Sequence, residues 1–419
     1  MQGKHTLSGS NRFSATSHKY TISAAQFVLQ LSMLLLCVGA VRAGHKSFTI
    51  NWIYLLLLLN VLLVLTSRRI NLRIMELLPF VMICAIEIPL QWLIGEYFGW
   101  RSALSGFIVL AMTVVLVAQL TRQGYEKKLW NVLNAVSIFS TICICMQTAG
   151  YLVGIRLDKI PVINELFFKA WEFSASFRPC ATFSEPSHYA EIVLLSLFYY
   201  LFVEQNKKLS LFLTCGLCLS TSGLGIIGAG LLLVFYLLNL DRFSRIKPLT
   251  KYTVVTLTFV MGVGALIWAQ STSLWIIQRI MSGGTSAARI WRSFDLFQIM
   301  DLAEKIFGIG IQNQMLYLNH YSITLAHDTY DTMVNREFAQ TLGYILCTTG
   351  ISGFLAFVFP FGKMILKQNY CMKALCLLFL FICFTCCIFS RHVFAIYLTM
   401  IYATAGMLRA SHSTQETKS

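Results

Sequence analysis

The sequence predicts an all-α, polytopic integral membrane protein with about twelve transmembrane helices. Of its 419 residues, 57% are hydrophobic and only 12% are charged, and the mean hydropathy is +0.67. The apolar residues form uninterrupted runs of roughly 17–25 residues, the length that crosses a bilayer as a helix. A soluble chain can bury many apolar residues, but not in runs of this length along the whole sequence. We therefore expect one transmembrane helical bundle rather than several soluble domains.

The predicted bundle, 23–408, lies between two polar tails. The tail 1–22 is basic and lacks the order of a removable signal peptide, so we expect it to be cytoplasmic, ahead of a retained first helix. The tail 409–419 follows the last helix and is also expected to be cytoplasmic. The seventh span is short, and a tight turn at Ser220–Gly223 separates it from the eighth. The expected spans are 23–41, 50–66, 74–94, 102–120, 131–154, 186–203, 208–221, 223–240, 252–270, 341–362, 374–389 and 393–408.

The basic residues set the orientation of these spans. With a cytoplasmic N-terminus, 20 of the 33 lysines and arginines fall in cytoplasmic segments and four fall in short outer loops. This distribution follows the positive-inside rule. The other nine lie in two long outer loops, 155–185 and 271–340, and long loops cross membranes largely regardless of charge. The predicted architecture is therefore a bundle that presents two basic extracytoplasmic loops.

Several function classes lack their sequence signals. There is no Walker-type phosphate loop, no dinucleotide-binding glycine motif, no HExxH zinc motif and no calcium-binding loop. The basic residues are not gathered in a nucleic-acid-binding module. Most of the thirteen cysteines lie in apolar runs, where cysteine behaves as a small hydrophobe, and the CxxC spacings at 215–218 and 383–386 have no histidine beside them. We expect no cofactor, no metal site and no nucleic-acid partner.

The first outer loop ends in "SFRPCATFSEPSHYAEI", which sets charged groups against a membrane span. Ser184 and Pro186 can begin a helix there, and Glu185 lies favourably near its positive end. Helix capping does not explain His188 and Glu191. Glu185, His188 and Glu191 recur at helical spacing and form one polar stripe down the outer end of the sixth span. Ionisable groups at membrane depth are candidates for a functional site, and the alternative is that they cap the helix and join neighbouring helices.

The second outer loop contains a candidate amphipathic helix from Ser286 to Leu302. Arg289 and Arg292 lie one turn apart on it, and two guanidinium groups at that spacing can grip a diphosphate. The alternative is that these arginines extend to phospholipid headgroups. The apolar positions, which suit a helix lying on the outer leaflet, are Ile290, Phe294, Phe297 and Met300.

The end of the second outer loop is also rich in ionisable residues. His327 stands next to Asp328, just before the last long helix. A histidine beside a carboxylate, facing the same aqueous space as an arginine pair, can act as a general base for a phosphate-anchored donor. A single loop histidine is more often incidental, so both interpretations stand. The other ionisable groups of this stretch are His320, Asp331, Arg336 and Glu337.

Four segments, taken in order, resemble the Wzy-type O-antigen and capsular polysaccharide polymerases. Motif one, "RPCATFSEPSHYAEI" (178–192), is similar to the family's E-P-x-x-Y/F-A element before a central span. Motif two, "CLSTSGLGIIGAGLLLV" (218–234), is similar to its T-x-S-R-x-G segment, with Gly223 in place of the usual arginine. Motif three (279–314) contains "GIGIQN", similar to G-x-G-x-x-N, and motif four (326–361) resembles the exit into the next helix.

The resemblance implies a glycosyltransferase of the bacterial inner membrane that needs neither metal nor nucleotide sugar. Its donors would be oligosaccharides carried on undecaprenyl diphosphate at the outer face. The growing glycan would move from its lipid diphosphate to the non-reducing end of the next unit, building O-antigen, capsule or exopolysaccharide. The expected partners are these lipid-linked oligosaccharides and membrane lipids, together with the flippase and chain-length regulator of the same pathway.

Roles follow from the resemblance residue by residue. Arg178 and Arg289, with Arg292, would bind the donor diphosphate and stabilise the charge that develops on the leaving group. His327, or Glu185 as the competing choice, would deprotonate the acceptor hydroxyl. Substrate-binding roles are expected for His188, Asp328 and Arg336.

Two other functions remain open from the sequence. An O-antigen ligase, which transfers finished glycan to the lipid A core, needs the same lipid-diphosphate site and acceptor base. A transporter or lipid flippase would instead need ionisable groups in mid-membrane, for which Glu76 and Glu87 in the third span are the comparable residues.

Overall fold

The structure is a computed structural model, and every regular element in the residues that it describes is a helix. The described residues are 26–37, 52–66, 72–94, 99–121, 124–155, 157, 179–183, 185–239, 284–325, 340–389 and 391–416. In chain order the helices are Gln26–Cys37, α2 (Trp52–Thr66), η1 (Leu72–Leu77), α3 (Leu78–Ile94), α4 (Trp100–Leu120), α5 (Glu126–Leu152), α7 (Pro186–Phe198) with its π-helical extension η3 (Tyr199–Val203), α8 (Lys207–Leu219), α9 (Gly223–Asn239), α13 (Gly284–Ile299), α14 (Leu302–Phe307), α15 (Gln314–His320), α17 (Thr341–Lys367), α18 (Tyr370–Thr385) and α19 (His392–Glu416).

Four of these helices are long and apolar enough to cross a membrane: α4, α5, α7 with its extension, and α17. Five further apolar helices are shorter. Helices coincide with eleven of the twelve predicted spans, and the ninth span, 252–270, lies outside the described residues. The chain therefore has the apolar helices of a membrane protein. The count of twelve spans and the two-loop topology stay predictions.

Large apolar side chains cover the outside of several helices. Leu65 on α2, Leu93 on α3 and Leu366 on α17 are each at least 74% exposed. Exposed apolar surface on this scale suits contact with lipid chains rather than water. The interior, by contrast, holds closely packed aromatic rings, with ring centroids 4.8 to 6.2 Å apart among Phe357, Phe361, Phe379 and Phe394.

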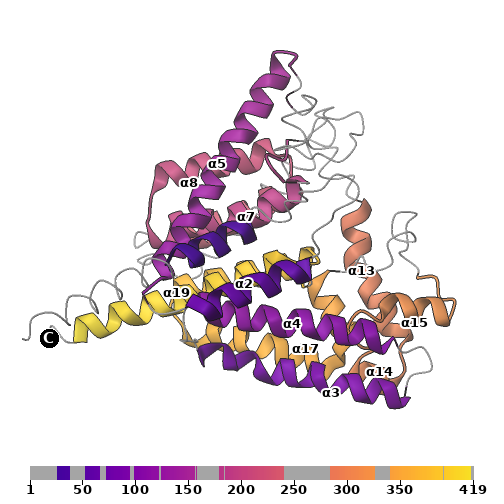
Figure 1. The fold of residues 1–419 in the computed structure, drawn as a ribbon. Helices are drawn as coiled ribbons and strands as arrows, with labels where there is room; N and C mark the ends of the chain where they lie inside the picture. The colour runs from indigo at the N-terminus through magenta and orange to yellow at the C-terminus, as the bar shows by residue number, and fades with distance from the viewer. Residues whose placement is uncertain are drawn as a thin grey trace, which may run out of the picture.

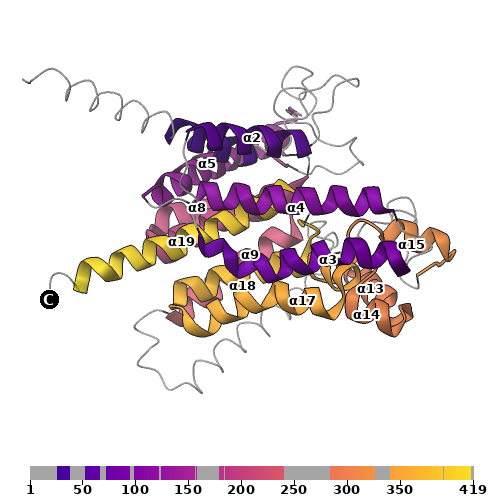
Figure 2. The same cartoon turned by 60° about the horizontal axis from the view of Figure 1, so that its bottom comes forward.

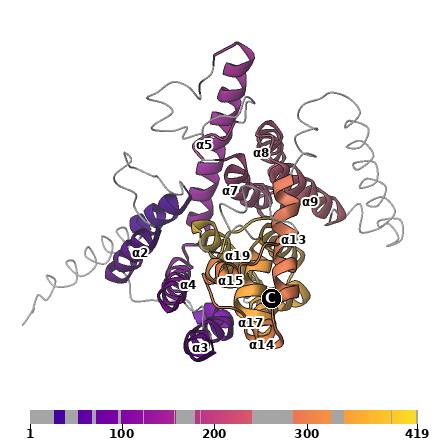
Figure 3. The ribbon, with the colours of Figure 1, turned by 90° about the vertical axis from the view of Figure 1, so that its right-hand side faces the viewer.

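The helices α3, α4 and α17 lie side by side, and α13, α14 and α15 gather at one end of this group (Figures 1 and 2). At the opposite end Glu76 of η1, which leads into α3, pairs with Lys363 of α17 at 3.5 Å, and Phe80, near the start of α3, packs on Phe357 of α17. Since these pairs run in opposite chain directions, α3 and α17 are antiparallel. Figure 3 shows α5 extending away from this group, with α7 and α8 beside it, and α9 packs on α7 and α8.

Helix α17 is broken near its N-terminal end. Gly350 has φ 64° and ψ −171°, a conformation outside the helical region, so two helical segments meet there. Only glycine adopts such a conformation without strain. Pro360, further along, also lies inside α17. The sequence analysis predicted an unbroken span at 341–362, and the break is the main local difference.

Two further local expectations are corrected. Helix α13 ends at Ile299, and Asp301 caps α14 through a capping box with Glu304, so the predicted helix to Leu302 is two helices. Among the described side chains of α13, Arg292, Ser293 and Leu296 are buried, whereas Trp291 and Phe294 are exposed, and the helix packs on α17. At α7 the N-cap is Glu185 rather than Ser184, and its side chain makes no capping hydrogen bond.

Candidate functional site

Motifs one and two pack directly against each other. Helix α7 carries the second half of motif one, from Pro186 onward, helix α9 carries most of motif two, and the two helices are in contact. Glycines allow the close approach: a Cβ atom built on Gly225 would lie 3.1 Å from the Cβ of Ala190, and one built on Gly228 would lie 2.6 Å from a methyl carbon of Leu194. The glycines of motif two therefore serve helix packing at these positions.

Hydrogen bonds between side chains fix α7 against α5. The hydroxyl groups of Tyr189 and Thr141 are 2.8 Å apart, and the Ser196 hydroxyl donates to Ser137 at 2.8 Å. All four residues are buried. Buried hydroxyl groups that are paired in this way stabilise one relative placement of two helices, because unpaired they would each cost free energy. The polar residues of α5 thus set the position of α7.

The segment just before α7 is held by the same helix. Ala181 donates its backbone N–H to the Gln147 side chain at 2.9 Å, and it has a positive φ of 53°. Residues 179–183 of motif one are thereby anchored to α5. Gln147 is itself buried, so this contact is part of the core rather than the surface.

A buried ion pair joins α7 to the connection between α18 and α19. Arg391 donates from Nη1 and Nη2 to the two carboxylate oxygens of Glu191, at 3.0 and 2.8 Å. The Glu191 side chain is 1% exposed, whereas the Arg391 side chain is 27% exposed. Tyr397 of α19 also donates to the Glu191 backbone carbonyl at 2.9 Å. Because a lone buried carboxylate is strongly unfavourable, this fork ties the outer part of α7 to residues 386–391.

The other two members of the polar stripe remain reachable. Glu185 and His188 are half-buried, one at the N-terminus of α7 and one in its first turn. The Ser187 hydroxyl donates to the Glu185 carboxylate at 3.0 Å. Glu191, one turn further down, is neutralised by Arg391. Of the two carboxylates, Glu185 is therefore the one available to a ligand.

Motifs three and four also meet, through backbone groups. The N–H groups of Ile309 and Gly310 donate to the carbonyl oxygens of Cys347 and Thr348, at 3.0 and 2.9 Å. These carbonyls lie just ahead of the break in α17. The turn that follows α14 therefore inserts its backbone at the point where the helix is interrupted.

Glycine is required on both sides of this joint. A Cβ atom on Gly308 would lie 2.3 Å from the Thr348 carbonyl oxygen, and one on Gly350 would lie 2.3 Å from the Ile306 carbonyl oxygen. Gly308 and Gly310 also have positive φ values, 84° and 87°. The two glycines of the G-x-G-x-x-N pattern thus have structural reasons to be glycine.

Neighbouring side chains stiffen this end of the turn. Tyr317 of α15 donates its hydroxyl hydrogen bond to the Glu304 carboxylate of α14 at 2.9 Å. Burial, helped by the Glu304 carboxylate, raises the pKa of Tyr317 above its ordinary value, so the hydroxyl stays protonated and keeps donating.

The connection 386–391 links the two motif pairs. The Thr341 backbone N–H and hydroxyl both donate to the Cys386 carbonyl, at 3.0 and 2.7 Å, and the Ile388 N–H donates to the Thr341 hydroxyl at 2.8 Å. The ring centroids of Phe389 and Tyr344 are 5.6 Å apart. The same connection ends in the arginine that pairs with α7. Segments from both halves of the sequence therefore converge at one place.

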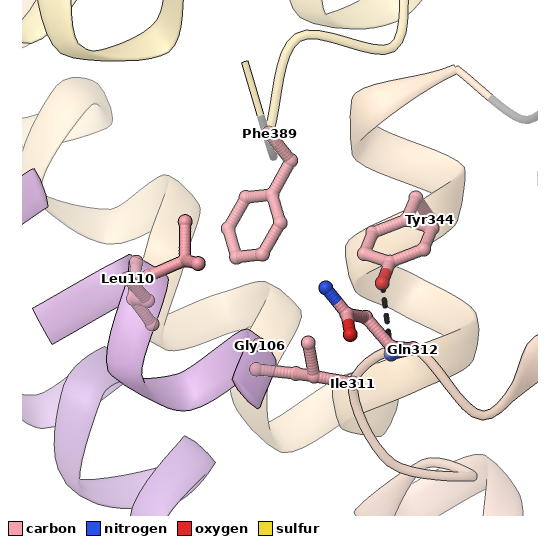
Figure 4. Close-up of a pocket in the computed structure, with 7 residues that line it drawn as sticks. Gly106, Leu110, Ile311, Gln312, Tyr344 and Phe389 are labelled. Atoms are coloured by element: carbon pink, nitrogen blue, oxygen red, sulfur yellow. Dashed lines mark hydrogen bonds between the residues drawn. The ribbon is translucent and has the colours of Figure 1, made fainter. Parts of the chain in front are cut away.

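A small cavity lies beside this connection (Figure 4). Its volume is about 10 Å³, roughly the room for one water molecule. Gln312 donates its backbone N–H to the Tyr344 hydroxyl at 2.9 Å, and its side-chain amide extends toward Phe389 and Leu110. The lining residues are Gly106, Val109, Leu110, Ile311, Gln312, Tyr344 and Phe389.

The predicted site residues differ in where they lie in the structure. Glu185 and His188 lie at the start of α7, beside the Glu191–Arg391 pair. Arg292 is 3% exposed, in the face of α13 that packs on α17, so a diphosphate would reach it only inside the protein. Arg289 lies within α13, but the structure does not describe its side chain. The residues outside the described ranges are Arg178, His327, Asp328 and Arg336.

Sequence reasoning missed three residues of this region. Arg391 was counted only as one charge of a short outer loop, although an isolated arginine between two apolar helices is a signal of a buried partner. Gly350 and Gln312 left no comparable signal, because their importance comes from backbone conformation. Within the described residues, no group of three histidine, cysteine or acidic side chains is arranged to hold a metal ion.

Comparison of the sequence with models of known protein families and with curated proteins finds no match.

Proposed function

We propose that the chain is a polysaccharide polymerase that joins undecaprenyl-diphosphate-linked oligosaccharide units at the outer face of a bacterial inner membrane. One observation carries the proposal. The four sequence motifs that resemble the Wzy-type polymerases, scattered over 178–361, pack in two pairs, and the connection 386–391 links the pairs. Motifs that act on one substrate must meet in space, so this convergence supports a shared site.

Charge favours Glu185 as the acceptor base. Glu185, Glu191 and Arg391 together leave a net negative charge at the start of α7, which repels a diphosphate and favours removal of a proton from a hydroxyl group. Glu191 is occupied by its arginine, whereas the Glu185 carboxylate accepts only a serine hydroxyl in the described structure. His327 stays the competing base.

The donor diphosphate is then assigned to the basic residues of the two outer loops. Arg178 and Arg289 are the first choices, because Arg292 is enclosed between α13 and α17. Substrate-binding roles for His188, Asp328 and Arg336 complete the proposal. Bidentate guanidinium contacts suit the diphosphate, which carries the charge that develops when the glycosidic bond to it breaks.

The test is complementation of a deletion strain. Wild-type protein should restore long polymer ladders, and Glu185→Gln and Arg178→Ala/Arg289→Ala should not, at equal protein levels in the membrane. Full ladders from the double arginine variant would refute the diphosphate assignment. The deletion phenotype separates polymerase from ligase: single repeat units on lipid A indicate a lost polymerase, and polymer left on the lipid carrier indicates a lost ligase.

A further inference from the structure

We infer that the cavity beside Gln312 binds one hydroxyl group of the acceptor sugar and so selects which repeat unit is extended. The inference rests on the proposed function and adds a specificity site to it. It starts from the chemistry of the lining. The walls are apolar and aromatic, the polar groups are a side-chain amide and a tyrosine hydroxyl, and none of the lining residues that the structure describes is charged.

Such a lining suits a neutral hydroxylated ligand. An amide offers a donor and an acceptor to one hydroxyl, and aromatic rings such as Phe389 pack on the apolar C–H faces of sugars. The cavity has room for about one water molecule, so it takes a single hydroxyl and not a whole ring. A charged group would be desolvated there without a counter-charge.

The backbone of Gln312 is held in an unfavourable conformation to place this amide. Its φ is 62°, in the left-handed region that residues other than glycine rarely adopt. The hydrogen bond to Tyr344 and the contact of Ile311 with Gly106 hold the turn in place, since a Cβ on Gly106 would lie 2.5 Å from Ile311 and 3.3 Å from Gln312. Strain of this kind concentrates at ligand-binding positions.

The turn also contains side-chain amides that have no hydrogen-bond partner in the described structure. In the described structure the Gln312 side-chain amide has no hydrogen-bond partner. The hydrogen bond that this residue donates to Tyr344 comes from its backbone N–H. The next residue, Asn313, is fully buried, and neither of its amide atoms has a hydrogen-bond partner within the same described structure. Only the Gln312 amide lines the cavity, and an unpaired amide there can serve a polar ligand.

The location fits an acceptor. Phe389, one wall of the cavity, lies on the same connection as Arg391, which pairs with Glu191 one α7 turn away from His188. Phe389, Arg391 and Glu191 thus connect the cavity to helix α7, which carries the proposed base, Glu185, at its N-terminus.

The experiment measures coupling between Gln312 and individual sugar hydroxyl groups. Purified protein in lipid nanodiscs is given lipid-linked repeat units from a strain that lacks this chain, and synthetic analogues in which each hydroxyl of the terminal sugar, other than the one that is glycosylated, is replaced in turn by hydrogen. Gln312→Gly is the main variant, because it removes the amide and relieves the positive φ, so the fold is preserved. Gln312→Asn, with a shorter amide, is the second variant.

We expect the wild-type protein to extend one deoxy analogue about 10- to 100-fold more slowly, since that analogue leaves the amide unpaired. Gln312→Gly should remove this discrimination and leave the other analogues unchanged. Gln298→Leu, which removes an exposed amide of α13 outside the cavity, should keep it.

Discrimination that survives in Gln312→Gly, or a uniform loss on all analogues, would overturn the inference, and a water molecule would then be the cavity's occupant. Absence of any extension by the wild-type protein would overturn the proposed function, and this inference with it.

Discussion

The two motif pairs of the candidate site are held together in different ways. Side chains hold α7: an arginine–glutamate fork, two pairs of hydroxyl groups and a buried glutamine connect it to its surroundings. Backbone groups hold the 308–310 turn in the break of α17, and glycines permit the approach. The first region can lose one contact and keep the rest. In the second region the backbones are in direct contact at the glycines, so a single added methyl group would clash.

This difference has a functional consequence. Polar side chains at α7 can be exchanged during evolution or by design with graded effects on position. The position of Gln312 depends on close backbone packing at the 308–310 turn. A substitution that prevents this packing displaces the whole turn and does not shift it by degrees. The predictions that follow test this contrast, in decreasing order of their expected effect on stability.

The largest effect is expected at the glycine joint. Gly350→Ala would place a Cβ 2.3 Å from the Ile306 carbonyl and force an alanine to φ 64°. Strain of this type costs about 1–3 kcal/mol, and the clash is with backbone atoms that no side-chain rotation can move, so we expect a total above about 5 kcal/mol. We expect little or no monodisperse protein in detergent, measured by fluorescence-detected size-exclusion chromatography.

Gly362→Ala in the same helix is the matched control. A Cβ there meets nothing within 4 Å, so the variant should purify like the wild type. Equal yields of the Gly350 and Gly362 variants would show that the joint is not as tight as described.

The next effect is expected at the ion pair. Arg391→Ala leaves the buried Glu191 carboxylate without its counter-charge, which costs about 3–5 kcal/mol. The melting temperature of the purified protein should fall clearly. The double variant Glu191→Gln/Arg391→Gln should recover much of that loss, because no lone charge remains buried.

The exposed pair Glu76–Lys363 provides the comparison. Its side chains are 37% and 46% exposed, so Glu76→Gln should cost about 0–1 kcal/mol. If Arg391→Ala were no more harmful than Glu76→Gln, the ion pair would not be what positions α7.

A smaller effect is expected at the hydroxyl pairs. Thr141→Val leaves the Tyr189 hydroxyl without its partner, at a cost of about 1–3 kcal/mol. Thr141→Val/Tyr189→Phe removes both partners and should be closer to the wild type in thermal unfolding. A double variant that is worse than the sum of the two single variants would contradict this account.

The smallest effect on stability, with a large effect on activity, is expected for Glu185→Gln. The side chain is half-buried and makes one described hydrogen bond, from Ser187, which an amide oxygen can still accept. The melting temperature should stay within about 1 °C of the wild type, since a surface change is worth within about 0.5 kcal/mol. Polymer should be lost in the complementation assay. Glu204→Gln, exposed after η3, should keep both properties.

Much of the fold follows from the sequence because bilayer-spanning helices depend on local apolar composition. Runs such as 102–120 and 341–362 need only their own residues to be recognised. The π-helical end of α7 and the break at Gly350 depend on what the helix packs against, so composition does not reveal them. The 251–283 region and the loop around His327 lie outside the described residues, so what the sequence predicts for them stays a prediction.

The site follows the same division. Glu185 and His188 were recognisable because charged groups at a span boundary are unusual. The partner of Glu191 was not, since Arg391 is 200 residues away in the sequence and its contact depends on tertiary packing. For α13, the position of Arg292 was predicted but its burial was not, because the helix packs on α17 instead of lying on an exposed surface. A helical repeat gives the face of a helix, but not what covers it.

The joint at Gly350 also bears on how the protein is made. The 308–310 turn leaves the ribosome before the segment of α17 that accepts its hydrogen bonds. Until residues 347–350 arrive, the N–H groups of Ile309 and Gly310 lack these acceptors. Assembly of this region is therefore a late event of synthesis, and a chain that stops before α17 would leave motif three without its partner even though every residue of that motif is present.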